Sequence, residues 1–211
     1  MADYRLHCFA QSGNSYKAAL ALALAGADWE PVFVDFFNGE TRSPGYRAQN
    51  EMGEAPILDH AGLALSQSGV ILDYLSGQLG RYGPESEAER LEILRWILWD
   101  NHKFTSYTAT LRFLRCFVPE AQRNADVIAW LEGRARAAWA VLDTHLAARD
   151  WIAADRLTTA DLSCAGYIFY GDEIGFDTGA YPAIARWREA IAALPGWRHP
   201  YDLMPGHPLQ S

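Results

Sequence analysis

The sequence is poor in positive charge and in cysteine, and it has no long apolar run. Among 211 residues, 18 are Lys or Arg and 26 are Asp or Glu, so the formal net charge is −8. Only two of the bases are lysines, Lys17 and Lys103. A nucleic-acid partner requires a basic face that neutralises phosphates, and an anionic membrane surface repels an acidic chain. The composition therefore predicts neither a nucleic-acid nor a membrane partner.

The three cysteines, Cys8, Cys116 and Cys164, form neither a CxxC pair nor a zinc-type spacing with histidine. We therefore expect no metal site. No apolar run approaches the ~18 residues of a membrane span, and the N-terminus has no charged-then-apolar leader. These absences predict a protein of the reducing cytoplasm.

The glycines and tryptophans of the chain are unevenly distributed along it. Half of its residues are hydrophobic and 13% are aromatic, which is enough to fill a core. Ten of the seventeen glycines lie in residues 1–85, whereas seven of the eight tryptophans lie in residues 86–211. We therefore expect two different kinds of structure: a domain over residues 1–80 and a second over 86–211, with a breaker-rich linker at 77–85.

The first part has the pattern of a small α/β domain. Apolar runs at 4–9 and 29–35 predict strands on either side of a helix at 15–25, which ends at Gly26. Runs at 56–58 and 63–65 flank a turn and predict a hairpin, and Ser68 begins a helix with apolar residues at helical spacing. The predicted order is β-α-β, a loop, then β-β-α.

The second part has a purely helical pattern. Helical spacing predicts four helices, at residues 87–117, 124–146, 159–176 and 181–193. We therefore expect an all-α domain.

Three short segments of the first part carry candidate chemistry. Pro56 begins a predicted strand, where a proline costs no ladder hydrogen bond. If the Ala55–Pro56 bond is cis, the main chain of Ala55 turns outward and can pair with a peptide-like ligand. Gln67 and Ser68 stand at a helix start, where Ser68 is either a simple N-cap or part of a carboxylate site.

The third segment lies between the first strand and the first helix. Ser12, Asn14 or Ser15 caps that helix. A hydroxyl or amide at this place also suits the stabilisation of a thiolate. A free thiol titrates near ~8.5, and each unit of pKa lowering corresponds to ~1.4 kcal/mol of preferential stabilisation of the anion.

The order and spacing of these motifs resemble the cytosolic glutathione S-transferase family, in its bacterial, theta- or zeta-like form with a Ser/Asn-type active site. Residues 158–161, Thr-Thr-Ala-Asp, resemble the family's capping motif at a buried helix, and residues 181–187 and 194–197 resemble its C-terminal helix. The resemblance covers nearly the whole chain. It implies a thioredoxin-like N-terminal domain with a mixed four-stranded sheet, followed by an all-helical domain.

The resemblance also implies roles for the candidate residues. The Ala55 main chain, before Pro56, would pair with the cysteinyl part of glutathione. Gln67 and Ser68 would hold the γ-glutamyl carboxylate and amine. Ser12 would be the catalytic hydroxyl, with Asn14 as the alternative.

Other positions depart from the family pattern or match it less directly. Glu54 stands where theta-like members often carry lysine, so a cation for the glycyl carboxylate is missing there, and Arg42 is the candidate replacement. The second substrate would lie against the helical half, where we expect His102, Phe104 and Tyr107 to line its pocket. Cys8 lies within a predicted strand, and we expect it to be a core residue.

The predicted function is a glutathione transferase, a detoxification enzyme that activates the glutathione thiol for attack on a small hydrophobic electrophile. The resemblance implies glutathione as co-substrate, no metal, and a cytoplasmic homodimer. A glutathione-dependent isomerase of the zeta-like kind and a non-catalytic glutathione-binding module remain alternatives. Thiol–disulfide reduction would need a reactive thiol in the turn after the first strand, and none is present there.

Overall fold

Four strands form a mixed sheet in the first part of the chain. The structure, a computed structural model, describes residues 2–207. The strands are β1 (Tyr4–Cys8), β2 (Trp29–Phe33), β3 (Ile57–His60) and β4 (Leu63–Ser66), in the spatial order β2-β1-β3-β4. β1 is parallel to β2 and antiparallel to β3, and β3 is antiparallel to β4. The predicted βαβ-ββα order and mixed sheet are confirmed.

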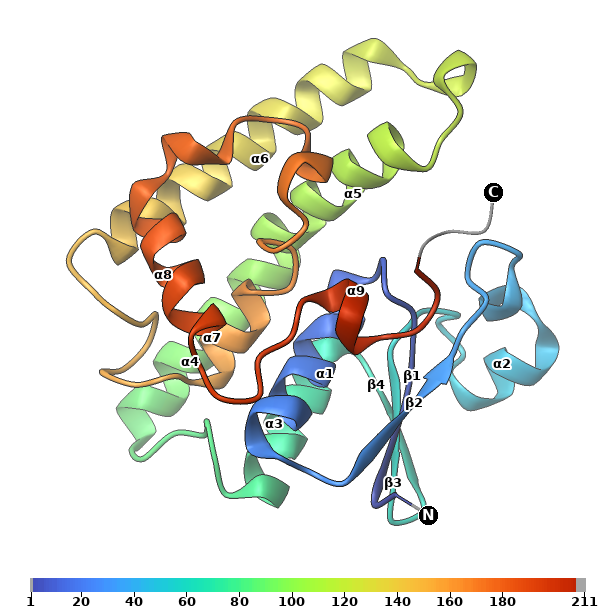
Figure 1. The fold of residues 1–211 in the computed structure, drawn as a ribbon, viewed down its shortest axis with the longest axis vertical. Helices are drawn as coiled ribbons and strands as arrows, with labels where there is room; N and C mark the ends of the chain where they lie inside the picture. Colours follow the sequence, from blue (N-terminus) through green and yellow to red (C-terminus); the bar gives the residue numbers. More distant parts are fainter. Residues whose placement is uncertain (1, 208–211) are drawn as a thin grey trace. The chain divides into compact units, whose positions relative to one another are not determined.

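Three helices accompany this sheet. They are α1 (Gly13–Ala25), α2 (Pro44–Gln49) and α3 (Ser68–Leu79). Figure 1 shows α1 and α3 on one side of the sheet and α2 on the other. α1 ends where Gly26 adopts a left-handed φ of 66°, a conformation that glycine reaches without steric cost.

The core of this part lies between the sheet and α1. Alternate residues of β1, Tyr4, Leu6 and Cys8, are buried, as the period of two along a strand requires. Burial raises the pKa of the Cys8 thiol to about 12. The prediction that Cys8 is a core residue is confirmed.

The end of the chain belongs with the sheet. The described residues divide into two units, the first from residues 2–83 together with 194–207 and the second from Pro84–Ala193. The expectation of a helical domain running on from residue 86 to 211 therefore differs from the structure. In the first unit, the Tyr16 hydroxyl donates to Arg198 O at 2.9 Å, and the short helix α9 (Pro200–Leu203) follows.

Residues 194–197, expected in a C-terminal helix, form a turn instead. Gly196 has a φ of 89°, which is left-handed, and Pro195 lacks the N–H that an interior helical position would donate. A methyl group added at Gly196 would lie 2.7 Å from Ala23 O. The turn thus lets the backbone approach the end of α1.

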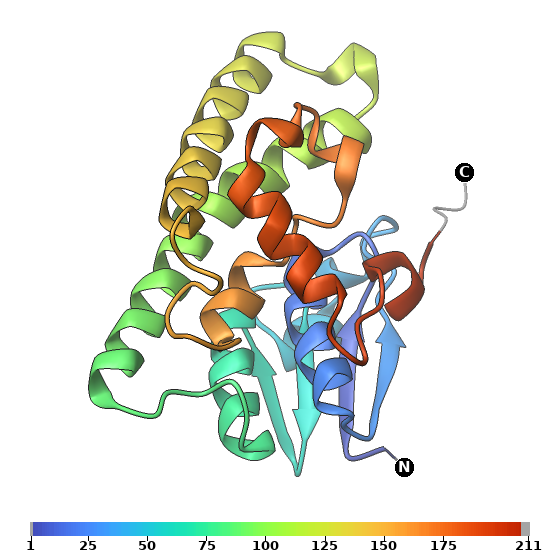
Figure 2. The same ribbon diagram turned by 60° about the vertical axis from the view of Figure 1, so that its left-hand side comes forward.

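The second unit is helical. Its helices are α4 (Glu87–Trp99), α5 (Thr105–Cys116), α6 (Ala125–Leu146), α7 (Thr159–Cys164) and α8 (Pro182–Ala192), shown in a second view in Figure 2. Short 3-10 turns occur at Glu40–Arg42 in the first unit and at Glu120–Gln122, Gly171–Ile174 and Thr178–Ala180 in the second. No helix among residues 2–207 is both long enough and apolar enough to cross a membrane.

Two of the four predicted helices are broken in the structure. A π-helical segment, Asp100–Phe104, divides residues 87–117, where the buried Asp100 carboxylate accepts hydrogen bonds from Thr105 Oγ1 at 2.7 Å and Ser163 Oγ at 2.6 Å. The helix expected at 159–176 ends at Cys164. Beyond it, Gly171 and Gly175 have positive φ values of 53° and 88°, which a helix does not accommodate.

The capping box at the start of α7 is confirmed. Asp161 Oδ2 accepts both the N–H and the hydroxyl of Thr158 at 2.9 Å, and Oδ1 accepts Ile152 N–H at 2.9 Å and Trp187 Nε1–H at 3.1 Å. Burial raises the pKa of this fully buried carboxyl group to about 6, although the four hydrogen-bond donors act to lower that pKa. Asp161 thus joins the loop before α7 to α8.

Candidate active site

Ser12 occupies the N-cap of α1. Its Oγ accepts the Ser15 N–H at 3.1 Å, and its own N–H donates to Phe9 O at 3.0 Å. The residue is buried, with 6% of its surface exposed. Ser12, rather than Asn14 or Ser15, is therefore the cap. Because its oxygen accepts the capping bond, the hydroxyl hydrogen remains available to a ligand.

Asn14 links the first turns of two helices. Its Oδ1 accepts a hydrogen bond from Ser68 Oγ, the first residue of α3, at 3.5 Å. The N-termini of α1 and α3 therefore face one region. A helix N-terminus leaves backbone N–H groups without intrahelical partners and carries the positive end of the helix dipole, so this region favours an anion.

The segment before β3 is held by α2. The Ala55–Pro56 peptide bond is cis, which was the condition for an outward-turned Ala55. The preceding carbonyl, Glu54 O, accepts the Tyr46 hydroxyl at 3.0 Å and Asn50 Nδ2 at 2.7 Å. The Tyr46 side chain of α2 and the Asn50 side chain at its C-cap thus orient this segment.

Gln67 has a strained backbone and a side chain directed at this segment. Its φ of 68° is left-handed for a residue other than glycine, a conformation that clusters at functional sites. Its Nε2 donates to Glu54 Oε2 at 3.0 Å and contacts Met52 Sδ at 2.9 Å. The structure thus brings Gln67 and Glu54 together.

The cations near this region are arginines. Arg42 is exposed, at the end of the turn Glu40–Arg42, and its guanidinium lies over Gly39. Arg47, on α2, is not among the residues predicted from the sequence, yet a methyl group added at Gly53 would lie 3.4 Å from its Nε. The signal was a basic residue in the last turn of the helix that precedes Gly53 and Glu54.

The three residues predicted to line an electrophile pocket differ in exposure. Phe104 is fully buried inside the helical unit, where its ring packs on Trp99 and Trp139 at centroid distances of 5.7 and 5.4 Å. His102 is exposed, and Tyr107 is half-buried. The core packing of Phe104 gives it a structural role.

Tyr107 belongs to a small cationic cluster. Its hydroxyl accepts hydrogen bonds from Arg134 Nη2 at 3.1 Å and Lys103 Nζ at 3.5 Å. The Arg134 hydrogen bond is the largest cause of a lowered pKa for this phenol, and Lys103 adds to it. Arg134 also lies over the Trp130 ring.

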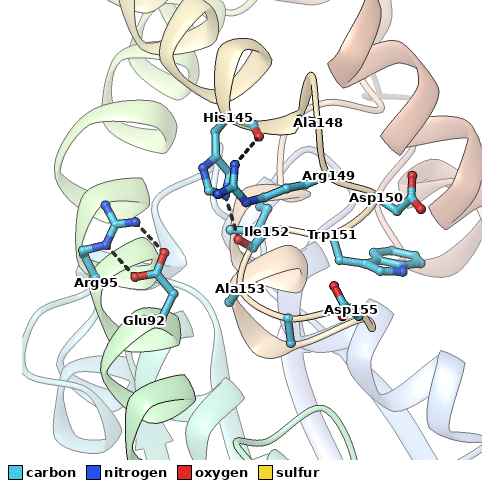
Figure 3. A pocket seen from close by; sticks show the side chains of 11 residues that line it. Glu92, Arg95, His145, Ala148, Arg149, Asp150, Trp151, Ile152, Ala153 and Asp155 are labelled. Atoms are coloured by element: carbon cyan, nitrogen blue, oxygen red, sulfur yellow. Dashed lines mark hydrogen bonds and ion pairs between the residues drawn. The ribbon is translucent and has the colours of Figure 1, made fainter.

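The helical unit contains a polar cavity of about 580 Å³, lined by α4, the end of α6 and residues 148–155 (Figure 3). His145 Nε2–H donates to Ile152 O at 2.7 Å, and its ring lies 4.3 Å from Trp96. Burial lowers the pKa of His145, and Arg149 donates to His145 O at 3.2 Å. None of the predicted site residues lines this cavity. Among residues 2–207, no cluster of three His, Cys, Asp or Glu side chains is arranged to hold a metal ion.

The chain is similar both to protein-family models and to individual known proteins. Residues 3–77 match the family described as "Glutathione S-transferase, N-terminal domain", and residues 108–195 match "Glutathione S-transferase, C-terminal domain". A possible glutathione S-transferase from Rhodopseudomonas palustris is 33% identical, with a TM-score of 0.88 over 96% of this chain and 91% of that one.

Two further relatives are similar over most of their length. The theta class glutathione S-transferase of Xanthomonas axonopodis pv. citri, solved with glutathione bound, is 25% identical, with a TM-score of 0.85 over 93% of this chain and 95% of that one. Glutathione S-transferase GstB of Escherichia coli (strain K12) is 26% identical over 191 residues, 89% of this chain and 92% of that protein. With both halves matched in order, this chain belongs to the glutathione S-transferase family.

Proposed function

We propose that this glutathione S-transferase binds glutathione in its first unit and conjugates the thiol to small hydrophobic electrophiles. The observation that carries the proposal is the Asn14–Ser68 hydrogen bond at 3.5 Å, which joins the N-termini of α1 and α3. A tripeptide with two carboxylates and a thiol suits a region with two helix N-termini. The γ-glutamyl carboxylate binds at Ser68 and Gln67, and the cysteinyl main chain pairs with Ala55 before the cis Pro56.

In this proposal, Ser12 activates the thiol. Its hydroxyl donates a hydrogen bond to the sulfur, and the N-terminus of α1 adds a favourable dipole. The thiol proton leaves to solvent, and the thiolate is the nucleophile. With an aryl halide, the new C–S bond forms on the ring carbon, the C–halogen bond breaks, and the halide leaves with its electron pair. The chain contributes activation and positioning.

The glycyl carboxylate of glutathione needs a partner of its own. Glu54 cannot supply a positive charge, and its side chain accepts a hydrogen bond from Gln67. We assign this carboxylate to Arg47, beside Gly53, with Arg42 as the second arginine. Glu54 then has an indirect role, in which it orients Gln67.

The proposed assembly is a homodimer. Leu91, Leu94 and Leu98 of α4 are 54%, 41% and 60% exposed, and their spacing places them on one helix face. In the first unit, Leu63 of β4 and Val70 of α3 are 49% and 52% exposed. Apolar stripes of this kind mark association surfaces. We place the dimer in the cytoplasm, where glutathione is kept reduced.

The test is steady-state conjugation of glutathione to 1-chloro-2,4-dinitrobenzene by the wild type, Ser12→Ala and Asn14→Ala. We expect Ser12→Ala to lose about 10- to 100-fold in kcat/KM, which is one or two pKa units of thiolate stabilisation. Full activity in Ser12→Ala together with its loss in Asn14→Ala would move the catalytic role to Asn14. Conversion of a cis-alkene substrate to its trans isomer, with glutathione recovered unchanged, would indicate the isomerase instead. Glutathione binding without turnover of any electrophile would indicate a binding module.

A further inference from the structure

The polar cavity of the helical unit, about 580 Å³ in volume, has no part in the proposed conjugation. It is lined by Glu92 and Arg95 of α4, His145 of α6 and residues 148–155 of the loop that follows α6 (Figure 3). All of these residues belong to the unit Pro84–Ala193. The volume lies in the range of roughly 300–1,000 Å³ that small-molecule sites occupy.

Some of the charged side chains that line this cavity are compensated by a partner in the protein. Arg95 Nε donates to Glu92 Oε2 at 2.8 Å, so these two charges cancel within the lining. The Asp150 carboxylate accepts a hydrogen bond from Arg186 Nη1 of α8 at 2.7 Å. None of these groups leaves a charge for a ligand to neutralise.

Arg149 and Asp155 differ from the other charged residues of the lining. The Arg149 guanidinium donates from Nη1 to the main-chain oxygen of His145 at 3.2 Å, and Figure 3 shows the side chain extended toward that residue. Within residues 2–207, neither Arg149 nor Asp155 forms an ion pair, with each other or with another side chain. The cavity therefore has one positive and one negative group that are both open to a ligand.

His145 adds a hydrogen-bond acceptor. A carbonyl oxygen only accepts hydrogen bonds, so the 2.7 Å contact with Ile152 O places the imidazole proton on Nε2. Burial lowers the pKa of His145, which favours the neutral ring with an unprotonated Nδ1. No hydrogen-bond donor within residues 2–207 pairs with that Nδ1. A ligand with N–H donors, such as an ammonium group, suits this lining.

The loop also supplies an apolar surface. Trp151 lines the cavity and is partly exposed, and Ala148, Ala153 and Ala154 line it too. A partly exposed indole offers a face or an edge on which an aromatic side chain can pack. The small alanine side chains leave room for such a ring.

The loop is anchored at Ile152, which lies between Arg149 and Asp155 in the sequence and is 1% exposed. Its N–H donates to Asp161 Oδ1 at 2.9 Å, and its carbonyl oxygen accepts the His145 Nε2–H. These two hydrogen bonds tie the middle of the loop to α7 and α6. A ligand therefore meets a preformed backbone, which lowers the entropic cost of binding.

We propose that this cavity binds a free aromatic α-amino acid as a zwitterion, with its carboxylate at Arg149, its ammonium group at Asp155 and its ring against Trp151. A zwitterion compensates both open charges at once. A simple anion would leave Asp155 without a partner, and a simple cation would leave Arg149 without one. The inference is independent of the proposed conjugation, because no residue assigned to glutathione lines the cavity.

The experiment compares three probes that share one ring and differ in charge. L-phenylalanine carries both charges, 3-phenylpropionate carries only the carboxylate, and 2-phenylethylamine carries only the ammonium group. Two-dimensional ¹H–¹⁵N NMR of the full chain follows the eight tryptophan indole signals during each titration, and the signal absent from Trp151→Phe is that of Trp151. We expect L-phenylalanine to shift this signal and to bind about three- to tenfold more tightly than either other probe.

Two variants separate the two charges. In Arg149→Ala, the affinity for L-phenylalanine should fall to that for 2-phenylethylamine, which itself should bind as it does to the wild type. In Asp155→Asn, it should fall to that for 3-phenylpropionate. Arg81→Ala and Asp73→Asn are the matched controls, since both residues are exposed and lie in the first unit, and they should keep the wild-type values. Thermal unfolding will show that each variant is folded.

A competition titration separates this cavity from the proposed glutathione site. The γ-glutamyl end of glutathione is itself an α-amino acid, so L-phenylalanine has a second conceivable binding place at Ser68. The wild-type titration is therefore repeated with saturating S-methylglutathione, and also with Ser68→Ala. The shift of the Trp151 signal and the dissociation constant for L-phenylalanine should be unchanged in both.

Three outcomes would overturn the inference. No shift of the Trp151 signal with L-phenylalanine shows that the cavity does not bind it, whatever becomes of the glutathione site. Equal affinities for the three probes show that the charges are not recognised. Loss of the shift with S-methylglutathione places the amino acid in the glutathione site. Failure to bind S-methylglutathione would remove the proposed function alone, because the two sites share no residue.

Discussion

Asn14 and Ser68 are 54 positions apart in the sequence, yet Asn14 Oδ1 accepts a hydrogen bond from Ser68 Oγ at 3.5 Å. The pair joins the first turn of α1, which carries the proposed thiol-activating residue, to the first turn of α3, which carries the proposed carboxylate site. In the proposed function, the Ser68 hydroxyl therefore links the carboxylate site to the segment that activates the thiol.

Ser68→Ala tests the carboxylate site. Loss of a hydrogen bond to a charged group costs about 1.5–3 kcal/mol, so the KM for glutathione should rise about tenfold or more, with a smaller change in kcat. Steady-state kinetics with varied glutathione measures both constants. Ser76→Ala is the control, because that hydroxyl lies near the other end of the same helix and donates to Asp73 O. Equal KM values for the two variants would contradict the assignment.

Ser12→Ala tests thiol activation through its pH dependence. A hydrogen bond to the thiolate lowers the pKa of bound glutathione below ~8.5, so kcat/KM rises with pH around that lowered value. Without the hydroxyl, the midpoint of the profile should move to higher pH by about one unit. A variant whose midpoint stays at the wild-type pH would show that Ser12 does not act on the thiol.

The cysteines should differ in reactivity. Burial raises the pKa of the Cys8 thiol to about 12 from an ordinary 9.0, so only a trace of Cys8 is thiolate at pH 8. Cys164 is buried too. Cys116 is exposed, although partial burial raises its pKa as well. Iodoacetamide at pH 8 should therefore label native Cys116 first, faster as the pH rises, while Cys8 and Cys164 react only after unfolding. Mass spectrometry of peptides will show this, and early labelling of native Cys8 would be inconsistent with its place in the core.

Asp161→Asn tests the junction between α7 and α8. Four donors converge on two carboxylate oxygens, and an asparagine offers one acceptor oxygen and an NH₂ group that faces donors. The free energy of unfolding should fall by about 3–5 kcal/mol, as measured by urea titration. A loss under about 1 kcal/mol would mean that the network contributes little.

The same carboxyl group predicts a pH dependence of wild-type stability. Its folded pKa is about 6, above the ordinary 3.8, so between these values the folded state binds more protons than the unfolded state. Stability from this group is fully present below 3.8 and is lost as the pH rises through about 6. The difference in unfolding free energy between wild type and Asp161→Asn should therefore shrink from pH 4 to pH 7.

Leu94→Glu tests the proposed dimer. Leu94 is 41% exposed at the centre of the α4 stripe, and a charge there is desolvated only if the stripe is covered. Sedimentation velocity should show a dimer for the wild type and a monomer for Leu94→Glu. Val127→Glu, at a residue of α6 that is 44% exposed, should remain dimeric. A wild type that sediments as a monomer would remove the dimer proposal.

Much of the candidate site was predictable because its signals are local. The N-cap, predicted at Ser12, Asn14 or Ser15 and found at Ser12, the terminating Gly26 and the Thr158–Asp161 box are each encoded within four residues, and each satisfies backbone groups at a helix end. The interruption of the long helix was not predictable in the same way. It coincides with Asp100, whose partner Ser163 lies 63 residues further along.

The sequence by itself determined the order of strands and helices, the family, and which short segments carry polar groups at helix starts, because periodicity and capping act over a few residues. Only the tertiary structure decided that Gln67 turns to Glu54, that Phe104 is a core residue, and that Pro205 and Gly206 return to the turn after β1. Those outcomes depend on side chains and carbonyls far apart in the chain. Tertiary packing brings these groups close together, and no pattern over a few neighbouring residues encodes that packing.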